Sequence, residues 1–288
     1  MIKKGIILAG GKGTRMSPLT KAVNKQLLPI YDKPLIFYPL SILMLAKIRD
    51  ILIIVNKGQL EQYRKILPDG KRLGIKITYA EQDKTRGLPD DFILGKKFIK
   101  NQKVALILGD NFFYSQSLTK TLLNCRKIKD GAKILLYKVS NPEKYGVAKI
   151  KNKKIISIIE KPKKYISNLA ITGLYFFDNK VIKYSEELKP SKRNELEITD
   201  LIKKYKKKKK LYPEILGRGA AWLDTGSIED FYKTSSFVSA IESRQGFKIA
   251  CLEEIAFNNK WIEKKQINDA INFYGNCDYS KYLKKLIS

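Results

Sequence analysis

The feature that most constrains the fold is the junction between a short apolar run and a glycine-rich, basic loop near the start of the chain. Residues 3–9 form a run of strand length, and Gly10, Gly11 and Gly13 follow at once, with Arg15 close behind. Glycines let backbone N–H groups approach phosphate oxygens without obstruction by side chains. The junction therefore predicts a buried parallel strand that feeds a phosphate-binding loop.

This loop does not match two well-known phosphate motifs. A Walker A loop needs Gly-Lys-Ser/Thr at a set spacing, and the dinucleotide fingerprint needs a third glycine that the segment lacks. A glycine-rich turn can also be no more than a tight connection between a strand and a helix. Lys21 and Lys25 follow shortly after Thr14 and Arg15, so a triphosphate could meet glycine amides and several cations within one stretch of chain.

Strand-like and helix-like segments alternate through the first part of the chain. Strands are expected at 50–55, 76–80 and 104–108, and helices at 34–46 and 59–67. This order is typical of βαβ units. The strand that ends at Leu108 runs directly into Asp110 and Asn111, and open α/β sheets bind ligands just beyond the carboxyl ends of their strands.

The middle of the chain predicts strands that lie closer together. They are expected at 133–139, 146–150, 155–160 and 171–177, with short strands near Ile215 and Trp222. The gaps between the first four are too short for crossover helices, which predicts partly antiparallel pairing. Further helices are expected at 118–128, 179–187, 197–208 and 228–244, and in the remaining C-terminal residues.

Together these elements predict one α/β fold with a helical appendage. We expect a Rossmann-like, mixed but mostly parallel sheet flanked by helices. The expected division is a catalytic core over residues 1–240 and a helical extension over residues 241–288, which would contribute to packing and oligomer contacts.

Composition narrows the chemistry. The 288 residues include no histidine, which removes the usual general base and the usual zinc ligand, so catalysis would depend on carboxylates, Lys, Arg and a metal. Cys125, Cys251 and Cys277 are scattered and suggest neither a disulfide framework nor a zinc site. No leader segment and no apolar stretch near the roughly 20 residues of a membrane span is found, so a cytoplasmic protein without membrane contact is expected.

The charge balance is strongly basic. The chain has 57 Lys and Arg against 28 Asp and Glu, a net charge of +29. Such a charge often indicates a nucleic-acid partner. Because the lysines are spread along the chain, we interpret them as a general residue bias and expect no nucleic-acid partner. The dense run at residues 203–210 is expected to be a solvated helix end.

Several longer segments resemble one enzyme family. The stretch from GIILAGGKGTR to LLPIYDKP is similar to the N-terminal signature of glucose-1-phosphate thymidylyltransferases, which belong to the sugar nucleotidyltransferases. The resemblance continues over nearly the whole chain through LGDNFFY, PEKYGVAKI, EKPKKYISNLAITGLYFFD, ELEITDL, GRGAAWLDTGS and RQGFKIACLEEIAF.

The resemblance implies an activity and a set of catalytic residues. It implies transfer of a nucleotidyl group from dTTP to glucose 1-phosphate, assisted by Mg²⁺. Asp110 and Asp224 would hold the metal, Arg15 and Lys25 would contact the triphosphate, and Lys161 would hold the sugar phosphate. Oxygen ligands and substrate phosphates suit Mg²⁺.

The resemblance also implies binding residues and an assembly. The nucleotide would be bound by Leu8, Gly10, Gly11, Gly13, Thr14, Gln82, Gly87 and Asp110. The sugar phosphate would be bound by Asn111, Tyr145, Gly146, Glu160, Lys161, Thr172 and Gly173. Members of the family usually form homotetramers that are regulated by a nucleotide sugar at a subunit interface.

Simpler interpretations of these residues stay open on sequence grounds. Asp110 could cap a loop, Asp224 could belong to a turn, and Glu160 with Lys161 could be an exposed strand end. Sequence spacing alone does not bring Asp110 and Asp224 together.

The chain departs from the family pattern at several positions. Leu88 to Asp91 replace a small, Gln-containing string near the expected base site, which bears on nucleotide choice. Ser17 replaces an aromatic residue in the loop, and Ser115 and Leu252 lie at the family's regulatory site. The alternatives are a UTP-dependent or other sugar-1-phosphate nucleotidyltransferase, a basic binding protein without catalysis, and an oligomeric regulatory subunit.

Overall fold

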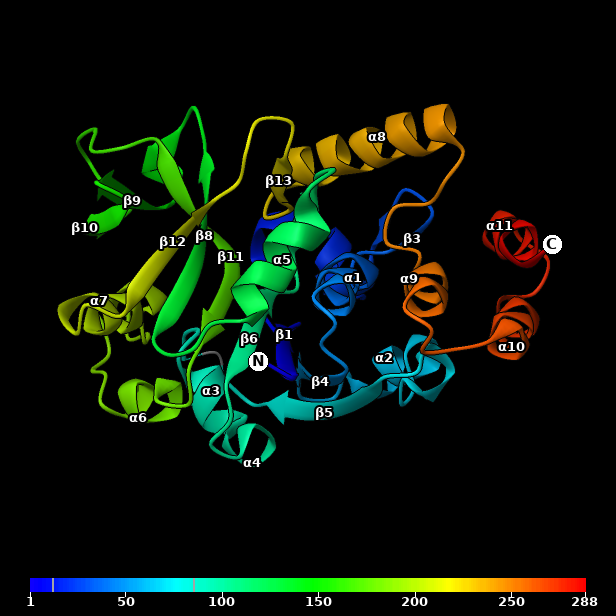
Figure 1. Cartoon of the computed structure of the whole chain (residues 1–288), viewed down its shortest axis with the longest axis horizontal. Helices are drawn as coiled ribbons and strands as arrows, with labels where there is room; N and C mark the ends of the chain where they lie inside the picture. Colours follow the sequence, from blue (N-terminus) through cyan, green and yellow to red (C-terminus); the bar gives the residue numbers. More distant parts are fainter. Residues whose placement is uncertain (12, 85) are drawn as a thin grey trace.

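The computed structural model describes residues 1–11, 13–84 and 86–288, and within these ranges a nine-stranded mixed sheet forms the centre of the molecule (Figure 1). Its main path runs β10-β9-β11-β6-β1-β4-β5, and β8 pairs with β11 and β12. Four neighbouring strands form a parallel block, namely β1 (Lys4–Leu8), β4 (Asp50–Asn56), β5 (Lys76–Gln82) and β6 (Val104–Leu108). The remaining strands are β8 (Ala132–Lys138), β9 (Gly146–Lys151), β10 (Lys154–Glu160), β11 (Leu169–Phe177) and β12 (Leu211–Ile215).

Helices cover both faces of this sheet. One face packs against α1 (Phe37–Leu45), α2 (Leu60–Ile66), α5 (Leu118–Arg126) and α9 (Leu252–Asn258). The other packs against α3 (Asp90–Leu94), α4 (Lys96–Ile99), α6 (Val181–Glu186) and α7 (Ile198–Lys207). Parallel strands that are buried on both faces need continuous apolar runs, which explains the composition of β1, β4 and β6.

Short elements connect the sheet to the loops above it. Two small antiparallel pairs are formed by β2 (Pro29–Ile30) with β3 (Lys33–Pro34), and by β7 (Asn111–Tyr114) with β13 (Ala221–Asp224). Single 3₁₀ turns are η1 (Thr14–Met16), η2 (Leu19–Lys21), η3 (Lys25–Leu27), η4 (Lys71–Leu73) and η5 (Pro142–Lys144). The long helix α8 (Ile228–Gln245) follows β13 and crosses the top of the view in Figure 1.

The C-terminal helices form one end of the molecule. After α9 come α10 (Lys264–Tyr274) and α11 (Asp278–Ile287), drawn in orange and red in Figure 1. The buried Glu253 carboxylate accepts hydrogen bonds from the hydroxyls of Tyr274 at 3.0 Å and Tyr279 at 2.6 Å, which join the three helices. Residue 240 lies inside α8, and α9 to α11 share a core cluster with α1, so the division at residue 240 stays a prediction.

The predicted fold class is confirmed, with local differences. The mixed α/β sheet, the flanking helices and the C-terminal helices are all present. The helix expected at 34–46 begins only at Phe37, because Lys33 and Pro34 pair with β2 instead. The strand β7 and the helices α3 and α4 were not predicted. No helix in the described ranges has both the length and the apolar character needed to cross a bilayer.

Candidate active site

The neighbouring strands β1 and β6 bring the glycine-rich loop and Asp110 together. Leu8 pairs with Leu108 at the carboxyl ends of the two strands, and the N–H of Gly109 donates to the carbonyl of Leu8 at 2.8 Å. A Cβ at Gly109 would lie 2.5 Å from that carbonyl oxygen, so the close approach requires glycine. The two predicted segments therefore share one edge of the sheet, which we call the carboxyl edge.

The ends of β4 and β5 support the glycine-rich loop. Asn56 exchanges two hydrogen bonds with the backbone of Gly11, one at 2.9 Å and one at 3.0 Å. A Cβ at Gly10 would lie 1.9 Å from Nε2 of Gln82, so the predicted base-reading amide lies against the loop. Gly11 and Gly13 have φ angles of 105° and 58°, which favour glycine. Thr14 begins η1, and Lys12 lies outside the described residues.

A buried polar network fixes the position of Lys25. Asn24, which is 4% exposed, caps η3 by accepting the N–H of Gln26 at 2.9 Å. Its amide donates to Gln59 at 2.6 Å, and its oxygen also accepts the hydroxyl of Tyr63 at 2.7 Å. Because η3 begins at Lys25, this network orients the lysine toward the carboxyl edge.

Lys25 forms an ion pair with Asp110. Its Nζ atom lies 2.5 Å from Oδ2 of Asp110, and the two side chains are 11% and 20% exposed. Burial by itself would raise the pKa of Asp110, but the Lys25 ammonium and a hydrogen bond from Asn111 outweigh it and lower the pKa below its usual value. Asp110 is therefore ionised at neutral pH.

The second predicted metal carboxylate lies beside the first. The β7–β13 pair places Asp224 opposite Asn111, and Thr225 donates its N–H at 3.1 Å and its hydroxyl at 2.8 Å to the carbonyl of Asp110. Burial, followed by the negative charge of Asp110, raises the pKa of Asp224 to about 6. The structure thus joins two carboxylates that are far apart in sequence.

Arg15 completes this cluster. A Cβ at Gly226 would lie 2.8 Å from Nη2 of Arg15 and 3.0 Å from Oδ1 of Asp224, so glycine leaves the room that both side chains need. Arg15 and Lys25 supply positive charge at the place where the two carboxylates meet. The arrangement combines anion-binding groups with a pair of oxygen ligands.

The donor set is compatible with Mg²⁺. In the described part of the chain no group of three or more His, Cys, Asp or Glu side chains forms a metal cage, so a metal here would take only Asp110 and Asp224 from the protein. Mg²⁺ is typically held by one or two carboxylates, together with substrate phosphates and water. Burial, and then the negative charge of Asp110, raise the pKa of Asp224, and a bound cation would favour its ionised form.

Asn111, from the predicted sugar set, is held in a network of hydrogen bonds. The residue is 2% exposed, and its Oδ1 accepts the N–H of Gly173 at 3.0 Å and the indole N–H of Trp222 at 2.6 Å. Its Nδ2 donates to Asp110 at 3.0 Å. Trp222 in turn packs against the ring of Tyr145, with ring centroids 5.2 Å apart. The orientation of the Asn111 amide is fixed by these contacts.

The predicted sugar carboxylate also reaches this region. Gly146 and Glu160 pair across β9 and β10, and a Cβ at Gly146 would lie 2.9 Å from Oε2 of Glu160. The N–H of Lys161 donates to the carbonyl of Tyr145 at 3.0 Å. Burial raises the pKa of Glu160 despite the adjacent Lys161.

Thr172 is placed differently from its neighbours in the predicted sugar set. Its side chain is fully buried, and its hydroxyl donates to the carbonyl of Leu135 at 3.1 Å, inside the sheet. The Thr172 hydroxyl is thus committed to β8. Any sugar contact at this residue would come from its backbone.

A loop before α7, which we call the strap (residues 191–197), was not predicted as part of the site. Glu197 accepts hydrogen bonds from Arg193 at 2.7 and 3.1 Å, and both residues act on the pKa of Glu160. At its other side, the N–H of Leu196 donates to the carbonyl of Arg86 at 2.7 Å. Gly87 has a φ of 100°, and a Cβ there would lie 2.1 Å from the carbonyl oxygen of Leu196.

The strap thus contacts the expected base loop and lies near the expected sugar carboxylate. Its sequence, SKRNELE, has no apolar periodicity that would reveal this position.

Gln26 is a second residue that the sequence did not reveal. It is 3% exposed, and its Oε1 has no hydrogen-bond partner in the described part of the chain. A Cβ at Gly109 would lie 3.0 Å from Cγ of Gln26, which places this residue directly behind the Asp110 loop. In the sequence, only its position next to Lys25 could have indicated that Gln26 lies near the site.

Asp91 belongs to the acidic segment Leu88 to Asp91 that departs from the family pattern near the expected base site, and its burial explains how this carboxyl is accommodated. Asp91 lies in the first turn of α3 and is only 3% exposed. Burial, and then the charge of Asp90, raise the pKa of Asp91 well above its usual range. The side chain is turned into the protein, so it does not form part of an exposed acidic surface.

The carboxyl edge as a whole has the properties of a nucleotide-handling enzyme site on an α/β fold. A family model of nucleotidyl transferases matches residues 4–240, so the chain belongs to this family. It is 47% identical over 285 residues to a glucose-1-phosphate thymidylyltransferase of Neisseria meningitidis, with 99% of both chains covered.

Solved structures show the same relationship. A putative glucose-1-phosphate thymidylyltransferase from Bacillus anthracis in complex with sucrose superposes with a TM-score of 0.76 at 40% identity, over 81% of this chain and 94% of that chain. A UDP-glucose pyrophosphorylase complexed with UDP-glucose has a TM-score of 0.73 at 28% identity, over 85% of this chain and 100% of that chain.

Proposed function

We propose that this protein transfers the thymidylyl group of dTTP to glucose 1-phosphate and releases pyrophosphate. The observation that carries the proposal is the cluster of Lys25, Asp110, Asp224 and Arg15 at the carboxyl edge, in which two carboxylates and two cations meet beside the glycine-rich loop. The near full-length similarity to a protein of that activity supports the same conclusion.

The reaction is a direct displacement. A phosphate oxygen of glucose 1-phosphate attacks the α-phosphorus of dTTP, and the bond from that phosphorus to the oxygen bridging to the β-phosphate breaks. The electron pair leaves with pyrophosphate, and dTDP-glucose forms. Because a sugar phosphate is already ionised near neutral pH, no general base is needed, which agrees with a chain without histidine.

Catalysis then depends on alignment and on positive charge. Arg15 grips the β- and γ-phosphates as negative charge develops on the leaving group, and Lys25 neutralises the triphosphate near the α-phosphorus. Lys161 holds the phosphate of the sugar. In the structure Lys25 is paired with Asp110, so its ammonium is held at the site before any substrate arrives.

Asp110 and Asp224 would hold Mg²⁺ in this site. When bound, the metal would supply positive charge to phosphate oxygens and would offset the repulsion between two anionic substrates. Asn111, through its hydrogen bond to Asp110, keeps the carboxylate oriented.

Recognition of the two substrates is divided between two parts of the edge. The glycine-rich loop from Leu8 to Thr14 would surround the triphosphate, and Gln82 with Gly87 would contact the base. On the other side, Glu160 would accept hydrogen bonds from sugar hydroxyls. The remaining sugar contacts would come from Asn111 and from the backbone near Tyr145, Gly146, Thr172 and Gly173.

A second candidate function is the same transfer from UTP. The structural similarity to a UDP-glucose pyrophosphorylase favours this alternative. A pocket that recognises one additional methyl group discriminates only about tenfold to a few hundredfold. We therefore expect measurable but slower turnover with UTP.

We also propose a homotetramer with a regulatory site away from the catalytic edge. A hollow of about 400 Å³ lies between α1, α5 and α9 and is lined by Phe113, Ser115, Leu118, Cys251 and Glu254, among others. Ser115 is one of the positions at which the chain departs from the family pattern. A saturating amount of a dTDP-sugar end product should lower the initial rate, and an unchanged rate would exclude this control.

The catalytic proposal is tested by pyrophosphate release in the presence of Mg²⁺ and glucose 1-phosphate. The rates with dTTP, UTP, ATP, GTP and CTP are compared under the same conditions. The proposal predicts the fastest release with dTTP, and fastest release with UTP would support the second candidate. No release with any nucleotide would overturn both.

A further inference from the structure

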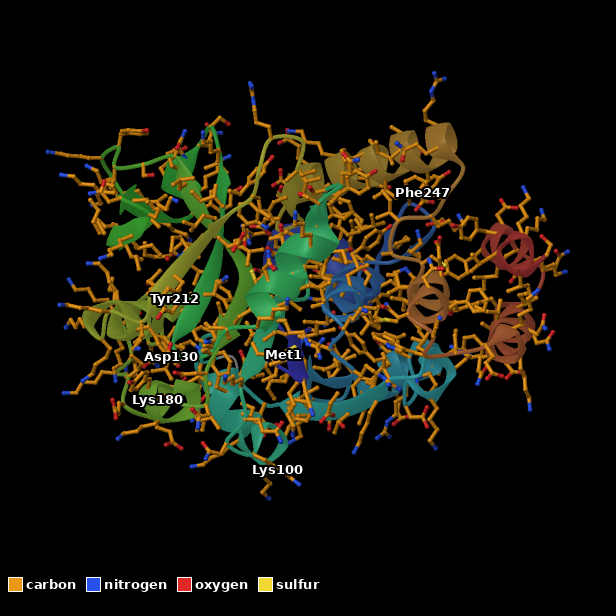
Figure 2. The ribbon with its side chains drawn as sticks, viewed as in Figure 1. Met1, Lys100, Asp130, Lys180, Tyr212 and Phe247 are labelled. Atoms are coloured by element: carbon orange, nitrogen blue, oxygen red, sulfur yellow. The ribbon has the colours of Figure 1, made fainter. Side chains whose placement is uncertain are left out.

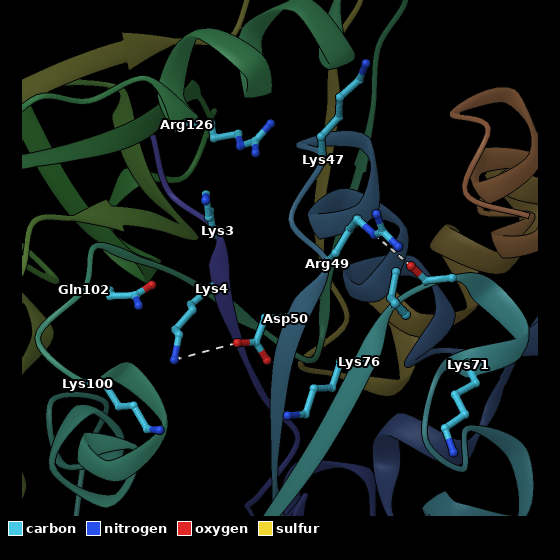
Figure 3. Close-up of a pocket in the computed structure, with 12 residues that line it drawn as sticks. Lys3, Lys4, Lys47, Arg49, Asp50, Lys71, Lys76, Lys100, Gln102 and Arg126 are labelled. Atoms are coloured by element: carbon cyan, nitrogen blue, oxygen red, sulfur yellow. Dashed lines mark hydrogen bonds and ion pairs between the residues drawn. The ribbon is translucent and has the colours of Figure 1, made fainter.

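The edge of the sheet opposite the carboxyl edge, which we call the amino edge, carries a basic groove. The amino ends of β1, β4, β5 and β6 meet there, and a hollow of about 930 Å³ opens between them (Figure 3). Its lining includes Lys3, Lys47, Arg49, Lys76, Lys100 and Arg126. Figure 2 shows Lys100 projecting from this lower rim of the molecule.

Two smaller hollows extend the groove. One of about 420 Å³ shares Lys4, Lys76 and Lys100 with the first and adds Lys97. Another, of about 410 Å³, shares Lys3 and adds Lys103. We call the three hollows together the basic groove. Because they share lining residues, the three hollows lie next to one another along this edge.

Most basic residues of the groove have no acidic partner within the described residues, although Lys71 forms an ion pair with Asp69 at 3.1 Å. Its described lining holds ten basic residues and one acidic residue, Asp50, which lies 3.7 Å from Lys4. Within the ranges that the structure covers, Lys47, Lys76 and Lys100 form no ion pair. Like charges in a concave surface raise the local potential and attract anions.

Two arginines in the groove are held in position by the backbone. Nε of Arg49 donates to the carbonyl of Gly74 at 2.8 Å, and its guanidinium lies 5.3 Å from the ring centroid of Trp261. Nε of Arg126 donates to the carbonyl of Ile2 at 2.8 Å. Each guanidinium keeps further N–H groups for a ligand, and its orientation is already set, which suits phosphate binding.

The groove offers many phosphate contacts but few rings for nucleobases. The aromatic residues in its described lining are Phe98 and Tyr79, both partly buried, and Nζ of Lys4 covers the Phe98 ring at 4.7 Å from its centroid. Single-stranded nucleic acids are usually held by open aromatic rings on which bases stack. A second copy of this chain is also a poor occupant, because each copy has a net charge of +29.

We propose that the basic groove binds linear inorganic polyphosphate. Such a chain has a charge at every unit and no bases, which matches adjoining hollows that are lined by many cations and few aromatic rings. The site lies at the amino edge, away from Asp110 and Asp224, so the proposal does not depend on the catalytic assignment.

The test compares two variants with equal charge loss in the full-length protein. Lys47, Lys76 and Lys100 are changed together to Gln in the groove variant, and the exposed Lys207, Lys208 and Lys209 at the end of α7 are changed to Gln in the control. Polyphosphate affinity is measured by titration at several salt concentrations. We expect the groove variant to lose about tenfold in affinity and its salt slope to fall by about 2, whereas the control changes less than about twofold.

Three results would overturn the proposal. Equal losses in the two variants would mean that binding follows net charge alone. Tighter binding of polyuridylate than of polyphosphate, at equal phosphate concentration, would make single-stranded nucleic acid the ligand. Displacement of polyphosphate by dTTP with Mg²⁺ would place it at the carboxyl edge instead. Thermal unfolding of each variant checks that both are folded.

Discussion

The carboxyl and amino edges of the central sheet are both rich in cations, but their electrostatic environments differ. At the carboxyl edge Lys25 lies 2.5 Å from Asp110, and Asp224 lies beside them. At the amino edge Lys47 and Lys76 line a hollow whose described residues include only one carboxylate, Asp50. Positive charge is thus matched to carboxylates on one side and left to solvent on the other.

The difference shows that charge alone does not identify a catalytic site. A cation can grip phosphate at either edge, but two carboxylates can hold a divalent metal only where they meet. We therefore expect substitutions at the carboxyl edge to change the rate of nucleotidyl transfer. Substitutions at the amino edge should change only anion binding and stability.

The largest effect is expected for Asp224→Asn. The change should slow nucleotidyl transfer by at least about 100-fold, because it removes one of the two proposed metal ligands. It should also make the metal-free protein more stable near neutral pH, by about 1–2 kcal/mol. Transfer rates and thermal unfolding without metal measure the two effects.

The sign of this stability effect follows from the pKa of Asp224. Burial, and then Asp110, raise it from 3.8 to about 6, so the folded protein favours the neutral carboxyl. The stability that the neutral Asp224 carboxyl contributes to the fold is fully present below about pH 4 and is lost as the pH rises through about 6. The stability advantage of Asp224→Asn over the unmodified protein should therefore grow between about pH 4 and pH 6 and should vanish below about pH 4.

Asp110→Asn is the matched control for stability. Lys25 and Asn111 keep the pKa of Asp110 below its usual value, so its ionised form stabilises the fold and its loss should bring no gain. If Asp224→Asn lowered stability near neutral pH, the described electrostatics of the pair would be wrong.

A smaller effect is expected for Gly10→Ala. The new Cβ would lie 1.9 Å from Nε2 of Gln82, and the flexible side chain would turn away from the loop. Loss of the proposed hydrogen bond from Gln82 to the base should raise the KM for dTTP about three- to tenfold, with a smaller change in kcat. Gly217→Ala is the control, because a Cβ there meets nothing within 4 Å. Equal KM values for the two variants would exclude Gln82 from base recognition.

The strap should affect only the sugar side. Arg193→Ala removes both hydrogen bonds to Glu197 and a positive charge near Glu160, so we expect the KM for glucose 1-phosphate to rise about threefold. Arg193→Lys should restore part of this loss, and Lys192→Ala, on the same loop, should change little. A rise in the KM for dTTP alone would contradict this division of roles.

The smallest effect is expected at the amino edge. The combined change of Lys47, Lys76 and Lys100 to Gln relieves repulsion in the groove. The free energy of unfolding should therefore rise by about 0.3 kcal/mol at low salt. The gain should disappear at high salt, where charges are screened. Thermal unfolding at the two salt concentrations measures it, and a loss of stability at low salt would show that these lysines make contacts that the structure does not contain.

Local elements of the fold could be predicted because they depend on local patterns. The apolar runs of β1, β4 and β6 and the glycine-rich loop are readable from consecutive residues. The start of α1 was misplaced because Lys33 and Pro34 form a short hairpin with Pro29 and Ile30, whereas the apolar spacing from Pro34 onward resembles that of a helix.

The geometry of the site was less predictable because it depends on distant pairings. Asp110 and Asp224 meet only through β7 and β13, and the strap reaches Gly87 only through a backbone bond to Arg86. The resemblance to a family identified the candidate site residues. Their spacing in the sequence did not show which of them lie in contact.

The lysines were interpreted as a general residue bias because, apart from the run at residues 203–210, they are spread along the sequence. The sheet changes this, since the amino ends of parallel strands lie at one edge and bring Lys3, Lys76 and Lys100 to one groove. A diffuse pattern along the chain has become a local one in space.

The most direct test of the central claim is the rate of pyrophosphate release from dTTP and glucose 1-phosphate with Mg²⁺, measured side by side in three proteins. These are the unmodified protein, Asp110→Asn, and the variant with Lys47, Lys76 and Lys100 changed to Gln. The account predicts that Asp110→Asn is at least about 100-fold slower, whereas the groove variant stays within about twofold of the unmodified protein. Equal loss in both variants, or full activity in Asp110→Asn, would contradict the assignment of catalysis to the carboxyl edge.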